Sequence, residues 1–254
     1  MLPSELTRWF AEWVRPLHAA YYALDLPGGR EAYAAANESL QLEPNPDLRE
    51  AKRLRLEFTW YIVMADLGEL DEKLAVYRTL LADCVKAAAG SGHASRSMAR
   101  ASLLLARLNA DFRGIEPLSQ SEFTQLVSVV PEEDRGPNFW HEVGCWAFQH
   151  HNGALLDEAY VYFTTQRLPE MADFMFSRLR LMHNLIAHTA TVENVLETVN
   201  RVEVFWQFDD FSRMLLPECA AQGLVTPLVQ QALHAKQIEM DQHGKRAPVR
   251  RAQR

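Results

Sequence analysis

The sequence predicts an all-α protein built from stacked antiparallel helix hairpins, about six pairs in all, arranged as an α-solenoid. Apolar residues recur at three- and four-residue steps along almost the whole chain, which is the period of a helix with one buried face. Prolines, glycines and short polar segments separate these stretches. No segment alternates apolar and polar residues over the length of a strand, so we expect no sheet.

The first helical segment, residues 4–25, shows the pattern most clearly. The apolar residues on its predicted buried side are Leu6, Trp9, Phe10, Trp13, Val14 and Leu17. Pro16 lacks a backbone N–H, so the helix should bend near Glu12 and form either one kinked rod or two short helices. The segment 27–29, Pro-Gly-Gly, then forces a turn into the second helix of the pair.

The same two-helix pattern repeats along the chain. The helix pairs are expected at 4–25 with 30–42, 47–66 with 70–88, 95–113 with 119–130, 138–151 with 154–167, 170–189 with 191–207, and 208–222 with 226–242. Successive pairs begin 32 to 48 residues apart, within the range of helical-hairpin repeats. A single hairpin cannot cover its own apolar face, so neighbouring pairs must stack. We therefore expect one helical-repeat domain over residues 1–243.

Parts of three pairs resemble the tetratricopeptide repeat, and the resemblance covers about half of the chain. The positions that carry it are Trp140, Val143, Gly144, Ala147, Ala159 and Phe163 in the fourth pair, Ala32, Ala36, Ser39 and Pro44 in the first, and Phe123, Leu126 and Pro131 in the third. Within the fourth pair, the spacing between the two halves is about three residues longer than in the family. The resemblance implies a concave surface, lined by the first helix of each pair, that binds extended or helical peptide segments of partner proteins.

The fourth pair also gives the candidate partner-binding residues. Transferring the groove-lining positions of the family onto this pair selects Asn138, His141, Glu142, Cys145, Phe148 and Gln149. Their amide, carboxylate, imidazole and aromatic groups suit hydrogen bonds to a peptide backbone together with one apolar anchor. The alternative is that they form an ordinary solvated helix face. Aromatic residues such as Trp146 and Phe148 are expected in the core, and the alternative is that some of them are exposed anchors for a partner.

Charge is distributed unevenly along the chain. The net charge is −7, yet residues 244–254 hold five of the 26 basic residues and none of the 33 acidic ones. The remaining chain, with 21 basic against 33 acidic residues, repels nucleic acid phosphates. We therefore expect no nucleic acid partner for the body of the fold, and a disordered, solubilising basic tail at 244–254.

The sequence favours a cytoplasmic protein with no membrane partner. It shows neither a secretory signal nor an uncharged stretch near the ~20 residues that a membrane span requires. Three cysteines, Cys84, Cys145 and Cys219, stand singly within predicted helices and are expected to be reduced and buried. The aromatic first helix is compatible with a homodimer, in which Trp9 and Trp13 would cover a second subunit.

One constellation suggests metal chemistry. His141, Glu142 and Cys145 partly match the HExxH zinc motif, with cysteine in place of the second histidine. A third ligand would have to come from a distant histidine, and the candidates are His150, His151, His183 and His188. Because the repeat pattern already accounts for the segment around Trp140 and Gly144, we predict no metal site and no cofactor. His150 and His151 are expected to end a helix, and Asp209 with Asp210 to start one.

These observations favour a non-enzymatic protein-interaction scaffold that binds a peptide or helix of a partner protein on a concave surface. The sequence lacks the phosphate-binding loop, the dinucleotide fingerprint and the nucleophile elbow of common enzyme classes. Two alternatives stay open. One is a regulatory module that senses a small ligand or a peptide, and the other is an all-α metal-dependent enzyme that uses His141 and Cys145.

Overall fold

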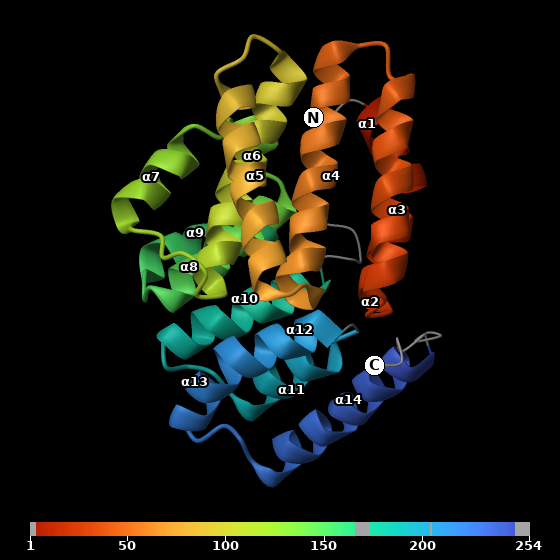
Figure 1. Cartoon of the computed structure of the whole chain (residues 1–254). Coiled ribbons are helices and arrows are strands. Elements are labelled where there is room, and N and C mark those ends of the chain that lie inside the picture. The colour runs from red at the N-terminus through yellow and green to blue at the C-terminus, as the bar shows by residue number, and fades with distance from the viewer. Residues whose placement is uncertain (1–3, 166–172, 204, 247–254) are drawn as a thin grey trace. The chain divides into compact units, whose positions relative to one another are not determined.

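Every regular element in the computed structural model is a helix (Figure 1). The structure describes residues 4–165, 173–203 and 205–246. These residues contain no strand, which confirms the all-α prediction. Within the same three ranges, no helix is both long and apolar enough to cross a membrane.

Contacts divide the described chain into two compact units, residues 4–135 and 136–246. The helices of the first unit are α1 (Ser4–Trp9), η1 (Phe10–Val14), α2 (Arg15–Tyr22), α3 (Leu26–Ser39), η2 (Leu40–Leu42), α4 (Pro46–Leu67), α5 (Leu70–Ala88), α6 (His93–Phe112), α7 (Gln120–Ser128) and η3 (Glu132–Asp134). Those of the second unit are α8 (Pro137–Gln149), α9 (Gly153–Thr165), α10 (Asp173–Ile186), α11 (Val192–Asn200), α12 (Phe205–Asp210), η5 (Phe211–Leu215), α13 (Leu216–Ala221) and α14 (Pro227–Arg246). Each predicted helix overlaps an observed one. The predicted start of the fifth pair, at 170, lies outside the described residues.

Pro16 bends the first helical segment through a π turn. In η1 the Arg15 N–H donates to the Phe10 carbonyl oxygen, five residues back, and Pro16 follows in the first turn of α2. The wider turn accommodates a proline that cannot donate and whose ring crowds the preceding turn. The same device recurs in the second unit, where the π-helix η5 precedes Pro217 in the first turn of α13. The sequence predicted a bend near Glu12 but neither of the two π turns.

Helix α4 is the centre of the first unit. It packs against α1, η1, α2, α3, α5 and α6. Its buried residues are Leu48, Ala51, Lys52, Leu54, Leu56, Thr59, Trp60, Tyr61, Val63, Met64 and Ala65. These residues lie on most sides of the helix, as expected for a helix that is covered by neighbours all round.

Helices α4 and α5 form an antiparallel pair. Early in α4, Arg53 Nη1 lies 2.6 Å from Oδ2 of Asp83, which is late in α5. Further along α4, the Tyr61 ring lies 5.4 Å from the ring of Tyr77, which comes earlier in α5. Partners that advance in one helix and retreat in the other show that the two helices run in opposite directions.

Helices α4 and α6, the first helices of successive pairs, run parallel. At the start of both, the Asp47 carboxylate accepts hydrogen bonds from the backbone N–H groups of Ala94 and Ser95, at 3.0 and 2.9 Å. At their ends, Asp66 pairs with the Arg113 guanidinium. The offset between partners is 48 residues at one end and 47 at the other. Asp47 therefore caps the N-terminus of the next first helix. A 2.6 Å hydrogen bond from the Ser95 hydroxyl, together with the backbone N–H groups, outweighs the effect of burial and lowers the pKa of Asp47.

Helices α2 and α4 are also parallel. The Phe10 ring, in the π turn before α2, lies 4.8 Å from the Arg55 guanidinium carbon in α4. Five residues after Pro16, the Tyr21 hydroxyl donates a 2.5 Å hydrogen bond to Asp66 Oδ2. Both pairs of partners are 45 residues apart. In the first unit, therefore, each first helix packs in the same direction on the next one.

In the second unit, α8 packs closely against α9 and α10 because Gly144 has no side chain. A Cβ atom at this position would collide with Leu179 Cδ2 in α10 and would lie 3.2 Å from Ala159 Cβ in α9. Nearby, the Trp140 ring stacks on Tyr162 with 5.8 Å between centroids. Gly144, Ala159 and Trp140 are among the positions that carry the sequence resemblance.

The last helices complete the second unit. In the antiparallel pair α10 and α11, Arg180 contacts Glu197 and, later in α10, Asn184 Nδ2 donates to Asn194 Oδ1 at 3.1 Å. Helix α11 also packs against α14. Helix α14 continues to Arg246, so the predicted basic tail begins inside a helix, and its residues 247–254 lie outside the described chain.

Candidate functional site

The predicted partner-binding residues all lie on α8, but the structure divides them into two groups. Three are buried in the core, with relative exposures of 1%, 6% and 5%: His141, Cys145 and Phe148. Three reach solvent at least in part: Asn138, Glu142 and Gln149. The second group is spaced by four and seven residues, so its members share one face of the helix. In this structure a partner can reach these three side chains, while the other three face the interior.

The two aromatic residues considered as exposed anchors are part of the core. Trp146 is 2% exposed, and Phe148 is buried as well. The expectation that either could serve as a surface anchor is therefore wrong. The Trp146 ring stacks on His150, whose centroid is 4.2 Å away and which caps the C-terminus of α8. This position confirms that His150 ends a helix.

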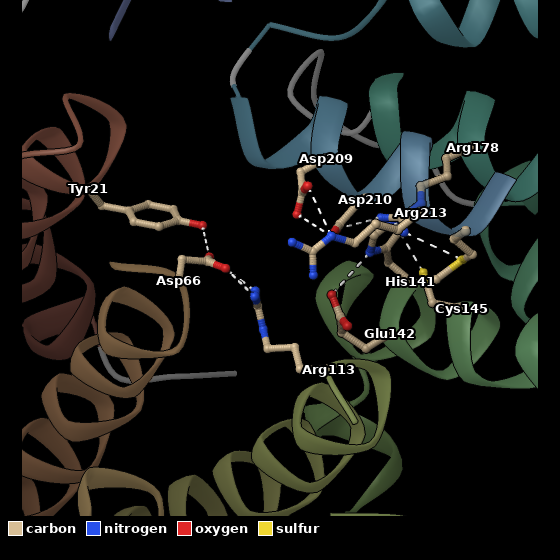
Figure 2. A network of polar contacts seen from close by, with 11 residues as sticks. Tyr21, Asp66, Arg113, His141, Glu142, Cys145, Arg178, Asp209, Asp210 and Arg213 are labelled. Atoms are coloured by element: carbon tan, nitrogen blue, oxygen red, sulfur yellow. Dashed lines mark hydrogen bonds and ion pairs between the residues drawn. The ribbon is translucent and has the colours of Figure 1, made fainter. Parts of the chain in front are cut away.

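His141 links a carboxylate and a thiol on α8 (Figure 2). Its Nδ1 atom lies 3.3 Å from Glu142 Oε1, and its Nε2 atom lies 3.9 Å from Cys145 Sγ. The helix produces this order because residues four apart lie one above the other, while Glu142 turns toward the surface. The buried imidazole thus has a polar neighbour at each ring nitrogen.

The protonation of His141 follows from these neighbours. Burial disfavours the charged imidazolium and would lower the pKa, and the Arg178 guanidinium acts in the same direction. The Cys145 sulfur and the Glu142 carboxylate favour the imidazolium and outweigh both effects, so the pKa of His141 is raised to about 9. His141 therefore carries a proton on both nitrogens at neutral pH.

Arg178 connects α10 to the π turn of the second unit. Its side chain is 2% exposed, and its Nη1 atom lies 3.2 Å from Asp210 Oδ2 at the end of α12 (Figure 2). Its Nη2 atom lies 3.6 Å from Met214 Sδ in η5. The Nε atom has no hydrogen-bond partner among the residues that the structure describes. Burial would lower the pKa of Arg178, but proximity to Cys145 on α8, and then to Asp210 and Glu142, outweighs burial and raises it.

Asp209 and Asp210 lie in the middle of the helical stretch formed by α12, η5 and α13. The expectation that they start a helix is therefore wrong, because the stretch already begins at Phe205. Adjacent helix positions point about 100° apart, and the two carboxylates accordingly take different partners. Asp210 turns inward to Arg178, while Asp209 Oδ2 pairs at 2.9 Å with Arg213, one turn along the same exposed face.

The histidines proposed as additional metal ligands occupy ordinary structural positions. His151 and His188 adopt left-handed conformations, with φ of 51° and 54°, in the turns after α8 and α10. His183 Nε2 lies 2.9 Å from Asp157 Oδ1 and its ring stacks on Tyr160. Across the described ranges, no group of three or more His, Cys, Asp and Glu side chains is placed to hold a metal ion.

A second polar cluster, in the first unit, joins three first helices (Figure 2). Asp66 at the end of α4 accepts a hydrogen bond from Tyr21 of α2 and pairs with both Nη atoms of Arg113, just after α6. Nearby, the hydroxyl of Tyr61 is buried and has no hydrogen-bond partner among the described residues. Burial is also the main reason why the pKa of Tyr61 is raised.

Chemically, the α8 cluster is better suited to holding helices than to turning over a substrate. Cysteine and histidine side chains can act as nucleophile and base when a substrate reaches them. Here Cys145 is 6% exposed and His141 1%, so neither side chain is presented to solvent. The exposed part of the site is the face formed by Asn138, Glu142 and Gln149.

The sequence analysis overlooked Arg178, although a signal was present. Phe174, Arg178, Leu181 and Leu185 are spaced by four, three and four residues, so the arginine stands in the apolar stripe of α10. All four are buried. A charged residue inside an apolar stripe predicts a buried partner of opposite charge, here Asp210. Its partner lies 32 residues away, and the sequence alone does not identify it.

Comparison with known proteins returned no match: no protein-family model fits the sequence, and no curated protein or solved structure is similar to it. The functional argument therefore depends on the geometry of the chain itself.

Proposed function

We propose that this protein is a non-enzymatic interaction scaffold: a tetratricopeptide-like array of helix pairs whose first helices bind a peptide or helix of a partner protein. The observation that carries the proposal is the parallel packing of successive first helices in the first unit. Partners 45 residues apart join α2 to α4, and partners 47 and 48 residues apart join α4 to α6. A near-constant offset of this kind is what a stack of similar hairpins produces.

Packing around α8 gives independent support. At Gly144 the first helix of the fourth pair approaches both its own second helix, through Ala159, and the next first helix, through Leu179. In helical repeats a small residue at this place permits that double contact. The second unit therefore combines hairpin pairing with stacking of first helices, as the first unit does.

On α8 we assign partner contact to the face formed by Asn138, Glu142 and Gln149. These side chains offer amide and carboxylate groups that hydrogen-bond a peptide backbone. His141, Cys145 and Phe148 act behind this face, where they hold α8 in place. A cytoplasmic location agrees with the reduced state of the three cysteines, which are all buried and free of disulfides.

The proposal is tested by photo-crosslinking in cells. A photoreactive amino acid is placed at Asn138 or Gln149 on α8 and, as matched controls, at Val161 or Thr164 on α9, which are exposed positions on a second helix. We expect one partner protein to be crosslinked from the α8 positions and not from the α9 positions. A synthetic peptide from the crosslinked segment should then compete.

Equal crosslinking from α8 and α9, or a partner that a matching peptide fails to displace, would contradict the assignment of the binding face. Substituting Phe148 or His141 is a poor test, because both are buried and their loss would disturb the core.

A further inference from the structure

Arg55, in the middle of α4, is a partly buried cation without a counter-charge. Its guanidinium makes no hydrogen bond or ion pair with any residue in the described part of the chain, whereas Arg53, two residues earlier, pairs with both Glu50 and Asp83. Burial lowers the pKa of Arg55, as expected for a cation that has lost water and gained no anion. The guanidinium nevertheless stays protonated at neutral pH.

Aromatic rings surround this cation. The Arg55 Cζ atom lies 4.8 Å from the centroid of Phe10 in η1 and 5.9 Å from that of Phe58 on the next turn of α4. The ring of His18 in α2 packs edge-on against Phe10 at 5.4 Å. All of these residues are partly exposed, so solvent reaches the cluster. Cation–π contacts offset some of the desolvation of Arg55, but they bring no negative charge.

His18 does not act as a second cation. Burial, together with the charge of Arg55, lowers the pKa of His18 to about 4, so the imidazole is neutral at pH 7. The cluster therefore presents a single positive charge. A guanidinium can form two parallel N–H bonds with a carboxylate or with a phosphate, but only the carboxylate matches a single positive charge, since the second charge of a phosphate dianion would stay uncompensated in this cluster.

We propose that Arg55, with Phe10, His18 and Phe58, forms a binding site for a carboxylate group attached to an apolar body. The carboxylate pairs with the guanidinium, and the apolar body contacts the aromatic rings. The site lies between the parallel first helices α2 and α4. It is separate from the face of α8 assigned above, and it stands whether or not that face binds a partner.

In the test, the full-length protein is titrated with each of two acids. Calorimetry and the NMR signals of the His18 ring measure the binding. The acids are 3-phenylpropionate, as a free organic acid, and N-acetyl-alanyl-phenylalanine, as the end of a peptide. The amide of the same dipeptide and inorganic phosphate are the comparison ligands. We expect saturable binding of the acids, and the tighter of the two identifies the source of the natural carboxylate. Binding should also raise the pKa of His18, because the carboxylate offsets the charge of Arg55.

Two variants test whether Arg55 is responsible for binding the carboxylate. Arg55→Met keeps an unbranched side chain between the rings and should weaken binding by about tenfold or more, since it removes a charged hydrogen-bonding group. Its melting temperature should be unchanged or higher, which separates loss of binding from loss of folding. Arg78→Met, at an exposed position of α5, should bind as the parent does. Equal binding of the amide, preferred binding of phosphate, or full binding by Arg55→Met would overturn the proposal.

Discussion

Two neighbouring aspartates in the second unit show how burial changes the value of an ion pair. Asp210 pairs with Arg178, whose side chain is 2% exposed, while Asp209 pairs with Arg213, whose side chain is 61% exposed. The chemical groups are the same, and the aspartates are adjacent in sequence. Water screens the outer pair and is excluded from the guanidinium of the inner one, so the inner pair should matter more for stability than the outer one.

Arg178→Met should therefore lower the free energy of unfolding by about 3 kcal/mol, because it removes the buried guanidinium that joins α10 to Asp210 and Met214. Arg213→Met serves as the matched control and should change it by less than about 1 kcal/mol. Urea denaturation followed by circular dichroism measures both. Equal losses in the two variants would show that burial of Arg178 is not what gives the inner pair its importance.

At the scale of elements, the sequence predicts the helices well because each carries its own signal. The apolar period locates α4 and α6, and proline or glycine ends most helices close to the expected residue. Side-chain partners are different, because they depend on which faces meet. The offset between α8 and α10 decides that Arg178 approaches His141, and no local pattern encodes that offset. All six predicted partner-binding residues accordingly lie on one helix, α8, but three of them turn inward.

Gly144 makes the contact between α8 and its two neighbours testable. Gly144→Ala should destabilise the protein by about 1–3 kcal/mol, since the added Cβ collides with Leu179 and crowds Ala159. Gly153→Ala is the control at the first residue of α9, where the nearest atom to a new Cβ is Ile186 Cγ2 at an ordinary 3.7 Å. It should be neutral or slightly stabilising, because alanine favours the helix.

The melting temperatures of the two glycine variants and of the parent protein, measured by thermal unfolding, test this prediction. A Gly144→Ala variant as stable as the parent would mean that the Leu179 side chain moves aside at no cost, so that the packing of α8 on α10 does not depend on a glycine at this position.

For the whole molecule, two histidines give the stability opposite dependences on pH. The pKa of His18 falls from 6.5 to about 4 on folding, so the unfolded chain binds the extra proton and stability decreases as pH falls from about 6.5 to 4. The pKa of His141 rises from 6.5 to about 9, so the folded chain holds the proton and this stabilisation is lost as pH rises from about 6.5 through 9. Together these two groups favour a maximum near pH 6.5.

Variants of the two histidines should flatten different parts of the curve of unfolding free energy against pH, one on the acid side and one on the alkaline side of pH 6.5. His18→Gln should reduce the loss of unfolding free energy between pH 6.5 and 4.5, and His141→Gln should reduce the loss between pH 6.5 and 9. The slope of the unfolding free energy against pH is the relevant quantity, since either substitution also shifts the unfolding free energy at every pH. Urea titrations at half-unit pH intervals measure it. An alkaline limb that is as steep in His141→Gln as in the parent would exclude the assignment of that limb to His141.

The π turns before Pro16 and Pro217 have a consequence for how the chain tolerates changes of length. A turn closed five residues back holds one residue more than a regular helical turn needs. Losing one residue from either turn would restore the usual winding, but it would also press the ring of Pro16 or Pro217 against a carbonyl of the preceding turn. Each of these two turns therefore has to keep its extra residue for as long as its proline is present.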